Sequence, residues 1–245
     1  MIKDFKSALM FITILPTGRN TEFSPSGMVR FFPVVGLFLG ALLIVTDLLS
    51  SLFWPLPVAA LMDVLFLAAV TGAFHLDGLG DTADGLFSHR SPQRALEIMK
   101  DSRTGMMGLV AVFSILALKT AGIYSLKNAG TGMFPLMVLL IVPAYARGGM
   151  LFGMRFLKYG RKNTGTGLGF FKNKLLPKDF IFLCIPVAVS LCLGMPGMVL
   201  NLVFALVVFL ILMFYKSKLG CITGDMLGAM TEITEAVLFL AAGAV

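Results

Sequence analysis

The sequence PLPVAALMDVLFLAAVTGAF at residues 55–74 leads directly into HLDGLGDTADG at residues 75–85. The first stretch is largely apolar and has about the length, roughly 20 residues, that an α-helix needs to cross the hydrocarbon core of a bilayer. The second stretch puts a histidine and three aspartates at the end of that helix. A spanning helix that ends in a dense acidic group therefore predicts both the fold and the place of a functional site.

The composition of the whole chain agrees with a membrane setting. Hydrophobic residues make up 58% of the sequence, the mean hydropathy is +0.91, and only 13% of the residues are charged. Soluble domains carry about 25% charged residues. We therefore expect an integral membrane protein with one membrane domain over residues 1–245 and no separate soluble module.

Apolar segments of about spanning length recur along the chain, and they predict an all-α, polytopic membrane helix bundle. The predicted spans are residues 33–53, 56–74, 105–126, 132–152, 180–194, 197–215 and 226–244. The segment 180–194 is short and ends in GMPG, so this segment and the next are alternatively a re-entrant pair. The prediction is therefore about seven spans, with six as the alternative.

The basic residues indicate the orientation of the bundle. In a seven-span arrangement, 17 of the 20 Lys and Arg residues fall on one side of the membrane. Lys119 and Arg147 lie inside spans, and Lys127 lies on the opposite side. By the positive-inside rule, the N-terminus and the three long loops are cytoplasmic. This asymmetry, with some attraction to anionic lipid headgroups, accounts for the net charge of +7 without a nucleic-acid partner.

Three aspartates in the second stretch share one side of a predicted helix. Asp77, Asp81 and Asp84 follow the spacing i, i+4, i+7. Like charges on one face repel unless a cation binds there, and oxygen ligands without nearby thiolates suit Mg²⁺, Mn²⁺ or Ca²⁺ better than zinc. The intervening glycines let a bulky ligand approach the backbone. The alternative is a solvated acidic loop or a helix cap.

A second polar group, KDSRTGMMG at residues 100–108, precedes the third predicted span. Asp101 is a candidate fourth carboxylate, and Lys100 and Arg103 are candidates for contacts to phosphate oxygens. The alternative for the two basic residues is simple anchoring at the cytoplasmic surface. Because acidic and basic side chains both occur next to the three aspartates, we favour a site that binds a metal ion together with a diphosphate. The glycine-rich stretch TGTGLGFF at residues 164–171 fits a flexible linker and a phosphate-contacting loop equally well.

The last predicted span carries a stripe of acidic residues. Asp225, Glu232 and Glu235 lie at i, i+7 and i+10. Ionisable groups are costly in lipid, so Glu232 and Glu235 should face the bundle interior, with Arg147 or Lys119 as partners. The alternative role of such a pair is to fix helix packing. Asp225, at the cytoplasmic end, is better placed to contact substrate or metal.

Several stretches of the sequence resemble a known protein family. HLDGLGDTADGLF at residues 75–87, followed by ALEIMKDSRTGMMG at residues 95–108, closely resembles the signature of the cobalamin synthases, the adenosylcobinamide-GDP ribazoletransferases. The similarity continues in four further stretches of the chain. These are ALMFITILPTG, FFPVVGLFLGA, PAYARGGM at residues 143–150 and GCITGDMLGAMTEITEAVLFLA at residues 220–241.

The resemblance implies the last nucleotide-loop assembly step of vitamin B12 biosynthesis. In this reaction, adenosylcobinamide-GDP is joined to α-ribazole or its 5′-phosphate, and GMP is released. The resemblance further implies a divalent metal, usually Mg²⁺ with Mn²⁺ as a substitute, and a bacterial or archaeal cytoplasmic (inner) membrane with the active site on the cytoplasmic side. A homo-oligomer, or association with other enzymes of cobalamin assembly, stays open.

The site residues follow from the resemblance and the residue chemistry together. The candidate metal ligands are Asp77, Asp81, Asp84 and Asp101. The candidate substrate-binding residues are Lys100, Arg103, Arg147 and Asp225. The candidate catalytic residues are Asp77, Asp81, Asp84 and His75. One of the aspartates or His75 would accept the proton of the attacking ribose hydroxyl. A histidine at the end of a span is more often an interfacial residue or one that positions a neighbouring group.

Other classes of protein are also compatible with parts of the sequence. The segment Asp81-Thr-Ala-Asp84-Gly85 is weakly similar to the CDP-alcohol phosphotransferases of lipid synthesis, but it continues Leu-Phe-Ser-His-Arg instead of matching their signature. An ion-coupled transporter would also carry charges within spans, usually near the bilayer midplane. A membrane scaffold would use the acidic stretch to recruit basic partners. The dense charge at the cytoplasmic edge favours an enzyme.

Overall fold

The computed structural model describes residues 1–18, 23–101, 103–129, 132–161 and 166–245, and it is built almost entirely of helices. Two short parallel strands are also present, in which Lys158 pairs with Cys221 and Tyr159 with Ile222. The helices before the acidic stretch are α1 Ile2–Ile12, α2 Pro25–Met28, η1 Val29–Phe31, α3 Phe32–Phe53 and α4 Leu56–Val70. The elements that follow are α5 Phe74–Leu86, α6 Pro92–Ile98, α7 Met106–Ala129, α8 Met133–Phe156, β1 Lys158–Tyr159, η2 Thr166–Phe171, η3 Pro177–Leu183, α9 Cys184–Leu191, α10 Met195–Lys218, β2 Cys221–Ile222 and α11 Gly224–Ala242.

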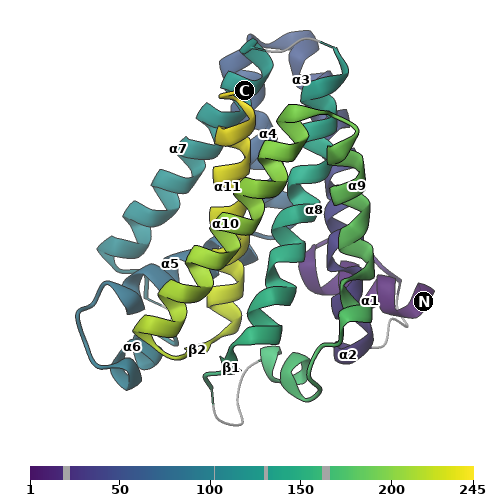
Figure 1. Ribbon diagram of the computed structural model, residues 1–245. Coiled ribbons are helices and arrows are strands. Elements are labelled where there is room, and N and C mark those ends of the chain that lie inside the picture. The colour runs from purple at the N-terminus through teal and green to yellow at the C-terminus, as the bar shows by residue number, and fades with distance from the viewer. Residues whose placement is uncertain (19–22, 102, 130–131, 162–165) are drawn as a thin grey trace.

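The long helices run back and forth between the two ends of the bundle. In Figure 1, α3, α7, α9 and α11 run toward the end where the C-terminus lies, whereas α4, α8 and α10 run toward the end that carries α6 and the two strands. The N-terminal helix α1 lies beside this second end. The predicted all-α membrane helix bundle is therefore confirmed.

Close backbone contact joins α3 to α8 at the centre of the bundle. Gly36 and Gly40 are one helical turn apart, and a Cβ atom at these positions would lie only 2.4 Å from Ala144 and 2.2 Å from the carbonyl oxygen of Leu140. Small residues at this spacing let two membrane helices pack backbone to backbone. The sequence FFPVVGLFLGA thus encodes a packing surface.

Only some of the predicted spans correspond to described helices that are long and apolar enough to cross a membrane. The helices α3 with its preceding turn, α7, α8 and α10 are each long and apolar enough to cross a membrane, and α4 with α5 would make a fifth crossing if that bent pair is one span. The segment 180–194 forms the end of the 3₁₀ helix η3 and the short helix α9. The helix α11 covers most of the last predicted span but is largely buried by its neighbours. The number of crossings and the orientation of the N-terminus stay predictions.

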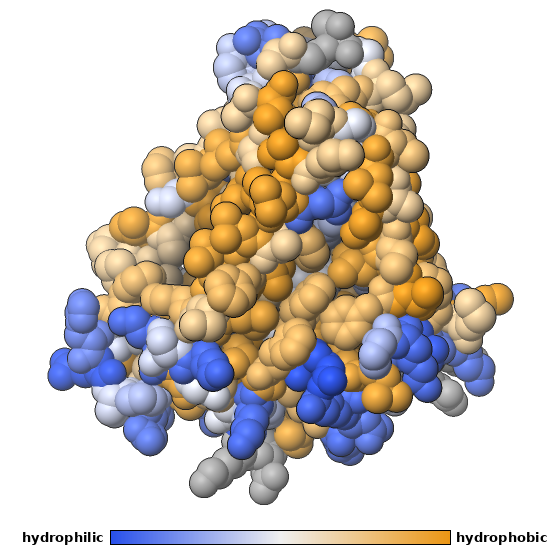
Figure 2. All heavy atoms as spheres, viewed as in Figure 1, coloured by the Kyte–Doolittle hydropathy of each residue, from blue (hydrophilic) through white to orange (hydrophobic). Residues whose placement is uncertain are grey.

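Charged and apolar residues separate on the surface. On the face that Figure 2 shows, apolar residues cover the long helices, with hydrophilic residues gathered at the end of the bundle that carries α6 and the strands, and fewer at the opposite end. Arg19 and Lys162, which contribute to the predicted charge asymmetry, lie outside the described residues, as do residues 164–165 of the glycine-rich stretch. The remainder of that stretch forms η2.

The two ends of α10 offer a test of the predicted orientation. In a cysteine-free background, Met195→Cys and Ser217→Cys place single thiols at opposite ends of one 24-residue helix, and both native side chains are exposed. A membrane-impermeant thiol reagent added to oriented vesicles is expected to label Ser217→Cys from the cytoplasmic side and Met195→Cys from the other. Labelling of both from the same side would contradict the predicted topology.

Candidate active site

A sharp bend separates the acidic helix from the apolar helix before it. The predicted span 56–74 is wrong in its last residues, because α4 ends at Val70 and α5 begins at Phe74, with an angle of 89° between the two helices. Gly72 and Ala73 adopt positive φ angles of 59° and 56° in the turn, a conformation that glycine adopts easily and alanine rarely. The bend carries α5 across the end of the bundle (Figure 1).

Asp77, Asp81 and Asp84 lie along one side of α5, and we call their three carboxylates the α5 carboxylate face. Asp77 is exposed, whereas Asp81 and Asp84 are half-buried. Burial, together with the charges of Asp77 and Asp225, raises the pKa of Asp81 to about 7. Asp84 acts in the same direction, so all three predicted aspartates interact electrostatically as expected, and Asp225 from α11 joins them.

The glycines of α5 have a different role from the predicted one. A Cβ atom at Gly78 would lie 2.7 Å from the carbonyl oxygen of Asp225, and one at Gly85 would lie 2.6 Å from the side chain of Met99. These glycines therefore allow α5 to pack closely against α11 and against the end of α6. The expectation that they leave the backbone open to a ligand is wrong at both positions.

An ion pair fixes Asp225 beside the α5 carboxylate face. Arg161, two residues after the end of β1, pairs with Asp225 and also donates a hydrogen bond of 3.2 Å to the carbonyl oxygen of Met99. The hydroxyl of Thr223 donates to the same carboxylate at 3.2 Å. Burial raises the pKa of Asp225, and Arg161 acts in the opposite direction. The arrangement places a cation next to the acidic group.

Asp84 joins α5 to the beginning of α7. Its carboxylate accepts hydrogen bonds from the backbone N–H groups of Gly105 at 2.6 Å and Gly108 at 2.8 Å. Gly105 immediately precedes α7 and Gly108 lies in its first turn, where no carbonyl within the helix can accept from these N–H groups. Asp84 therefore acts as a helix cap supplied by a neighbouring helix.

This contact predicts that Asp84→Asn differs from the other aspartate variants. The amide has only one oxygen to accept the two N–H groups, so we expect the free energy of unfolding to fall by about 0.5–1.5 kcal/mol, the usual net contribution of one hydrogen bond. Asp77→Asn has no such contact to lose. Thermal unfolding of the two purified variants compares them directly, and equal melting temperatures would show that Asp84 does not stabilise α7.

Asp101 and Arg103 bind each other on the surface. The guanidinium of Arg103 donates to Oδ1 of Asp101 at 3.1 Å and to Oδ2 at 2.6 Å. These hydrogen bonds lower the pKa of Asp101 to about 2. The predicted roles of Asp101 as a metal ligand and of Arg103 as a phosphate contact would each require this pair to open. Lys100 is exposed nearby in sequence, and its contact with phosphate stays a prediction.

His75 faces the interior of the bundle. Its side chain is only 2% exposed, its backbone lies against Gly228 of α11, and its Nδ1 atom has no hydrogen-bond partner among the described residues. Because the imidazole is buried, it is poorly placed to take a proton from a substrate that approaches the exposed side of α5. The geometry fits a positioning residue at the junction of α5 and α11.

The buried charge cluster consists of Lys119, Arg147, Glu232 and Glu235. The ammonium group of Lys119 lies 2.6 Å from Glu232 and 2.5 Å from Glu235, and Arg147 pairs with the other oxygen of Glu235. Each of these side chains is at most 6% exposed. The prediction that the two glutamates face inward and meet Arg147 or Lys119 is therefore confirmed. Two positive and two negative charges leave the cluster neutral.

The residues fit a divalent cation in chemistry but do not form a complete cation site by themselves. Within the described ranges, no three His, Cys, Asp or Glu side chains are arranged to hold a metal ion. Asp77 and Asp81 nevertheless present carboxylate oxygens one helical turn apart, without a hydrogen bond or ion pair in the described structure. Oxygen donors of this kind suit Mg²⁺ or Mn²⁺, which keep several ligands from water or substrate phosphates.

Comparison with known proteins assigns this arrangement to a family. The sequence pattern of the cobalamin-5-phosphate synthases matches residues 4–243 of the chain. The chain belongs to the cobalamin-5-phosphate synthase family. The match includes α5, the buried charge cluster and both short strands, so the resemblance of the separate motifs is confirmed over nearly the whole length.

Curated relatives of this cobalamin-5-phosphate synthase family member carry one name. An adenosylcobinamide-GDP ribazoletransferase from Klebsiella pneumoniae (strain 342) is 38% identical over 248 residues, which cover 98% of this chain and 99% of the relative. An adenosylcobinamide-GDP ribazoletransferase from Alkaliphilus metalliredigens (strain QYMF) is 35% identical over 244 residues, which cover 96% and 93%. No solved structure matches the chain.

Sequence reasoning did not identify two features of this cobalamin-5-phosphate synthase family member. Arg161 was one of many basic loop residues, and only the pairing of β1 with β2 shows that it lies beside Asp225. A second group of charges lies between α3, α4 and α7, where Lys127 pairs with Asp47 and lies 4.0 Å from Asp63. Asp47 and Asp63 lie inside predicted spans, and this position alone predicts that each carboxylate has a partner in the bundle.

Proposed function

We propose that this chain is an adenosylcobinamide-GDP ribazoletransferase, which joins adenosylcobinamide-GDP to α-ribazole or its 5′-phosphate and releases GMP. The family match and the names of the relatives support this activity. The observation that carries the proposal is the position of the α5 carboxylate face at the polar end of the bundle, beside Arg161 and Asp225. A diphosphate and its charge-neutralising groups would meet there.

The membrane setting is that of the cytoplasmic (inner) membrane, with the site on the cytoplasmic side. The long apolar helices need a bilayer, and the basic loops beside α5 and β1 favour the cytoplasmic face by the positive-inside rule. A cytoplasmic site would also be accessible to soluble nucleotide substrates.

The proposed reaction forms one oxygen–phosphorus bond and breaks another at the same phosphorus. A ribose hydroxyl of α-ribazole attacks the diphosphate phosphorus nearest cobinamide, the bond from that phosphorus to the bridging oxygen breaks, and GMP leaves with that oxygen. The hydroxyl proton passes to a carboxylate of the α5 face, since His75 is buried. Such transfers depend mainly on positioning and on neutralising charge over the phosphate oxygens.

The residues that would position the diphosphate and neutralise its charge come from different helices and loops. Arg161 would bind the diphosphate after release from Asp225, because a guanidinium matches phosphate oxygens in geometry and charge. Lys100 and Arg103 would add charge at the edge of the site. Asp77 and Asp81 would hold Mg²⁺ or Mn²⁺, with Asp225 as a further ligand. When bound, the ion supplies charge neutralisation and polarises the phosphoryl oxygens.

Metal binding is expected to depend on pH through Asp81. With a pKa of about 7, the carboxyl is mostly protonated at pH 6 and mostly ionised at pH 8, and a cation binds only the ionised form. We expect Mn²⁺ affinity to fall about tenfold per pH unit below 7 and to level off above it, as one displaced proton requires. Electron paramagnetic resonance of free Mn²⁺ measures this. An unchanged pH dependence in Asp81→Asn would contradict the role of this group.

The activity is tested with purified protein, adenosylcobinamide-GDP and each acceptor in turn. The proposal expects GMP release that requires an acceptor and that differs between α-ribazole and its 5′-phosphate, which identifies the preferred substrate. Transfer from a CDP-alcohol to a lipid acceptor in place of this reaction would support the phospholipid-synthase alternative. Ion flux in vesicles without GMP release would support a transporter.

A further inference from the structure

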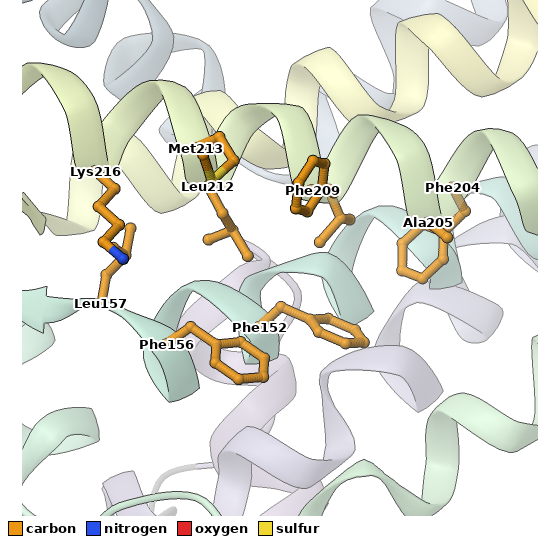
Figure 3. Close-up of a pocket in the computed structure, with 10 residues that line it drawn as sticks. Phe152, Phe156, Leu157, Phe204, Ala205, Phe209, Leu212, Met213 and Lys216 are labelled. Atoms are coloured by element: carbon orange, nitrogen blue, oxygen red, sulfur yellow. The ribbon is translucent and has the colours of Figure 1, made fainter.

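An apolar slot lies between α8 and α10 on the side of the bundle. Its volume is about 460 Å³, within the range of roughly 300–1,000 Å³ that is common for ligand pockets. Figure 3 shows Phe152 and Phe156 on α8 facing Phe209 and Leu212 on α10 across this gap. Phe156 and Phe209 are each more than half exposed, so the slot is open to whatever surrounds these helices.

One end of the slot is basic. Lys216 lines this end and lies beside Leu157 in Figure 3. No acidic residue lines the slot, and Lys216 forms no ion pair in the part of the chain that the structure describes. The ladder between β1 and β2 joins the chain just beyond α8 to the chain just beyond α10, and it adds Lys158 to the same end. The positive charge at this end therefore lacks a counterion from the lining.

We propose that this slot binds one acyl chain of an anionic bilayer phospholipid, with the lipid phosphate at Lys216. The walls belong to two helices that are long and apolar enough to cross a membrane, so the molecules that reach the slot from the side are lipids. A lysine at the end of such a helix extends its ammonium group toward the headgroups. Charge complementarity then selects an anionic headgroup over a zwitterionic one.

The test compares lipids that differ only in the headgroup. Purified full-length protein in neutral detergent is titrated with dioleoyl phosphatidylglycerol or dioleoyl phosphatidylcholine, and native mass spectrometry measures the tightest-bound lipid. We expect phosphatidylglycerol to bind about fivefold more tightly, which corresponds to about 1 kcal/mol for one basic residue near an anionic headgroup. The measurement needs no turnover, so its result is independent of the proposed enzymatic activity.

Two pairs of variants locate the binding site. Lys216→Gln should remove the headgroup preference, whereas the control Lys218→Gln should keep it, because Lys218 lies over the ring of Phe214 and does not line the slot. Ala205→Trp should fill the slot and weaken binding of both lipids. The control Leu206→Trp changes the neighbouring exposed residue and should have no such effect.

Several outcomes would overturn the proposal. An unchanged preference for phosphatidylglycerol in Lys216→Gln would remove the phosphate from this lysine. Unchanged lipid binding in a folded Ala205→Trp protein would remove the acyl chain from the slot. A protein dimer that Ala205→Trp dissociates, with no lipid bound in the wild type, would instead assign the slot to a second copy of the chain.

Discussion

Asp81→Asn is expected to lose nearly all GMP release while the protein stays folded. The carboxylate has no hydrogen bond or ion pair in the described structure, and burial beside Asp77 and Asp225 disfavours its charge. Its replacement therefore relieves repulsion without breaking a stabilising contact. An amide cannot offset the charge of a divalent cation as a carboxylate does. We expect turnover to fall on the order of 10²–10³-fold, the range for loss of one group that stabilises transition-state charge.

Asp77→Asn should lose turnover in the same way, with partial recovery at high Mg²⁺, because its exposed carboxylate is the easiest ligand for water to replace. Glu97→Gln is the matched control, since this side chain on α6 is 61% exposed and pairs with the similarly exposed Arg94 on the same helix. Its turnover should equal that of the wild type. Turnover near wild type in both aspartate variants, each with an unchanged melting temperature, would remove the reaction from α5.

Arg147→Leu is expected to destabilise the protein strongly. The change leaves Glu235 with Lys119 as its one remaining cation and gives the buried charge cluster a net negative charge in a site where its side chains are at most 6% exposed. Removal of one partner from a buried ion pair typically costs about 3–5 kcal/mol. We expect a large fall in melting temperature or a failure to accumulate in the membrane.

A compensating variant separates lost charge balance from lost packing. Arg147→Leu combined with Glu235→Gln restores neutrality, because Lys119 and Glu232 remain as a pair 2.6 Å apart. The double variant should be more stable than Arg147→Leu alone. Arg155→Leu, on the same helix but outside the cluster, is the control for loss of a half-buried arginine. A double variant no more stable than the single one would contradict an electrostatic role for the cluster.

Much of this arrangement could be predicted from sequence because it depends on local periodicity. The spacing of Glu232 and Glu235 places them on one side of a helix, and the cost of charge in lipid required them to face inward toward Lys119 or Arg147. Hydropathy likewise located the long helices. These inferences need only the period of an α-helix and the chemistry of the bilayer.

The parts that could not be predicted depend on tertiary packing. The turn at Gly72 and Ala73 breaks an apolar run that hydropathy reads as continuous. The cap that Asp84 provides to α7 depends on the contact between two helices, and the same residue spacing fits a metal ligand equally well. Arg161 reaches Asp225 because two short strands pair between distant parts of the chain. None of these contacts leaves a periodic signal in the sequence.

The proposed role of the α5 carboxylate face is to support attack of a ribose hydroxyl on the phosphorus nearest cobinamide. Mass spectrometry of both products from a single reaction with purified protein tests it most directly. From the wild type we expect a corrinoid with a completed nucleotide loop and one equivalent of GMP, and from folded Asp81→Asn at most about a hundredth of either product in the same reaction time. Cobinamide phosphate with a guanylylated ribazole, or equal amounts of product from the two proteins, would contradict it.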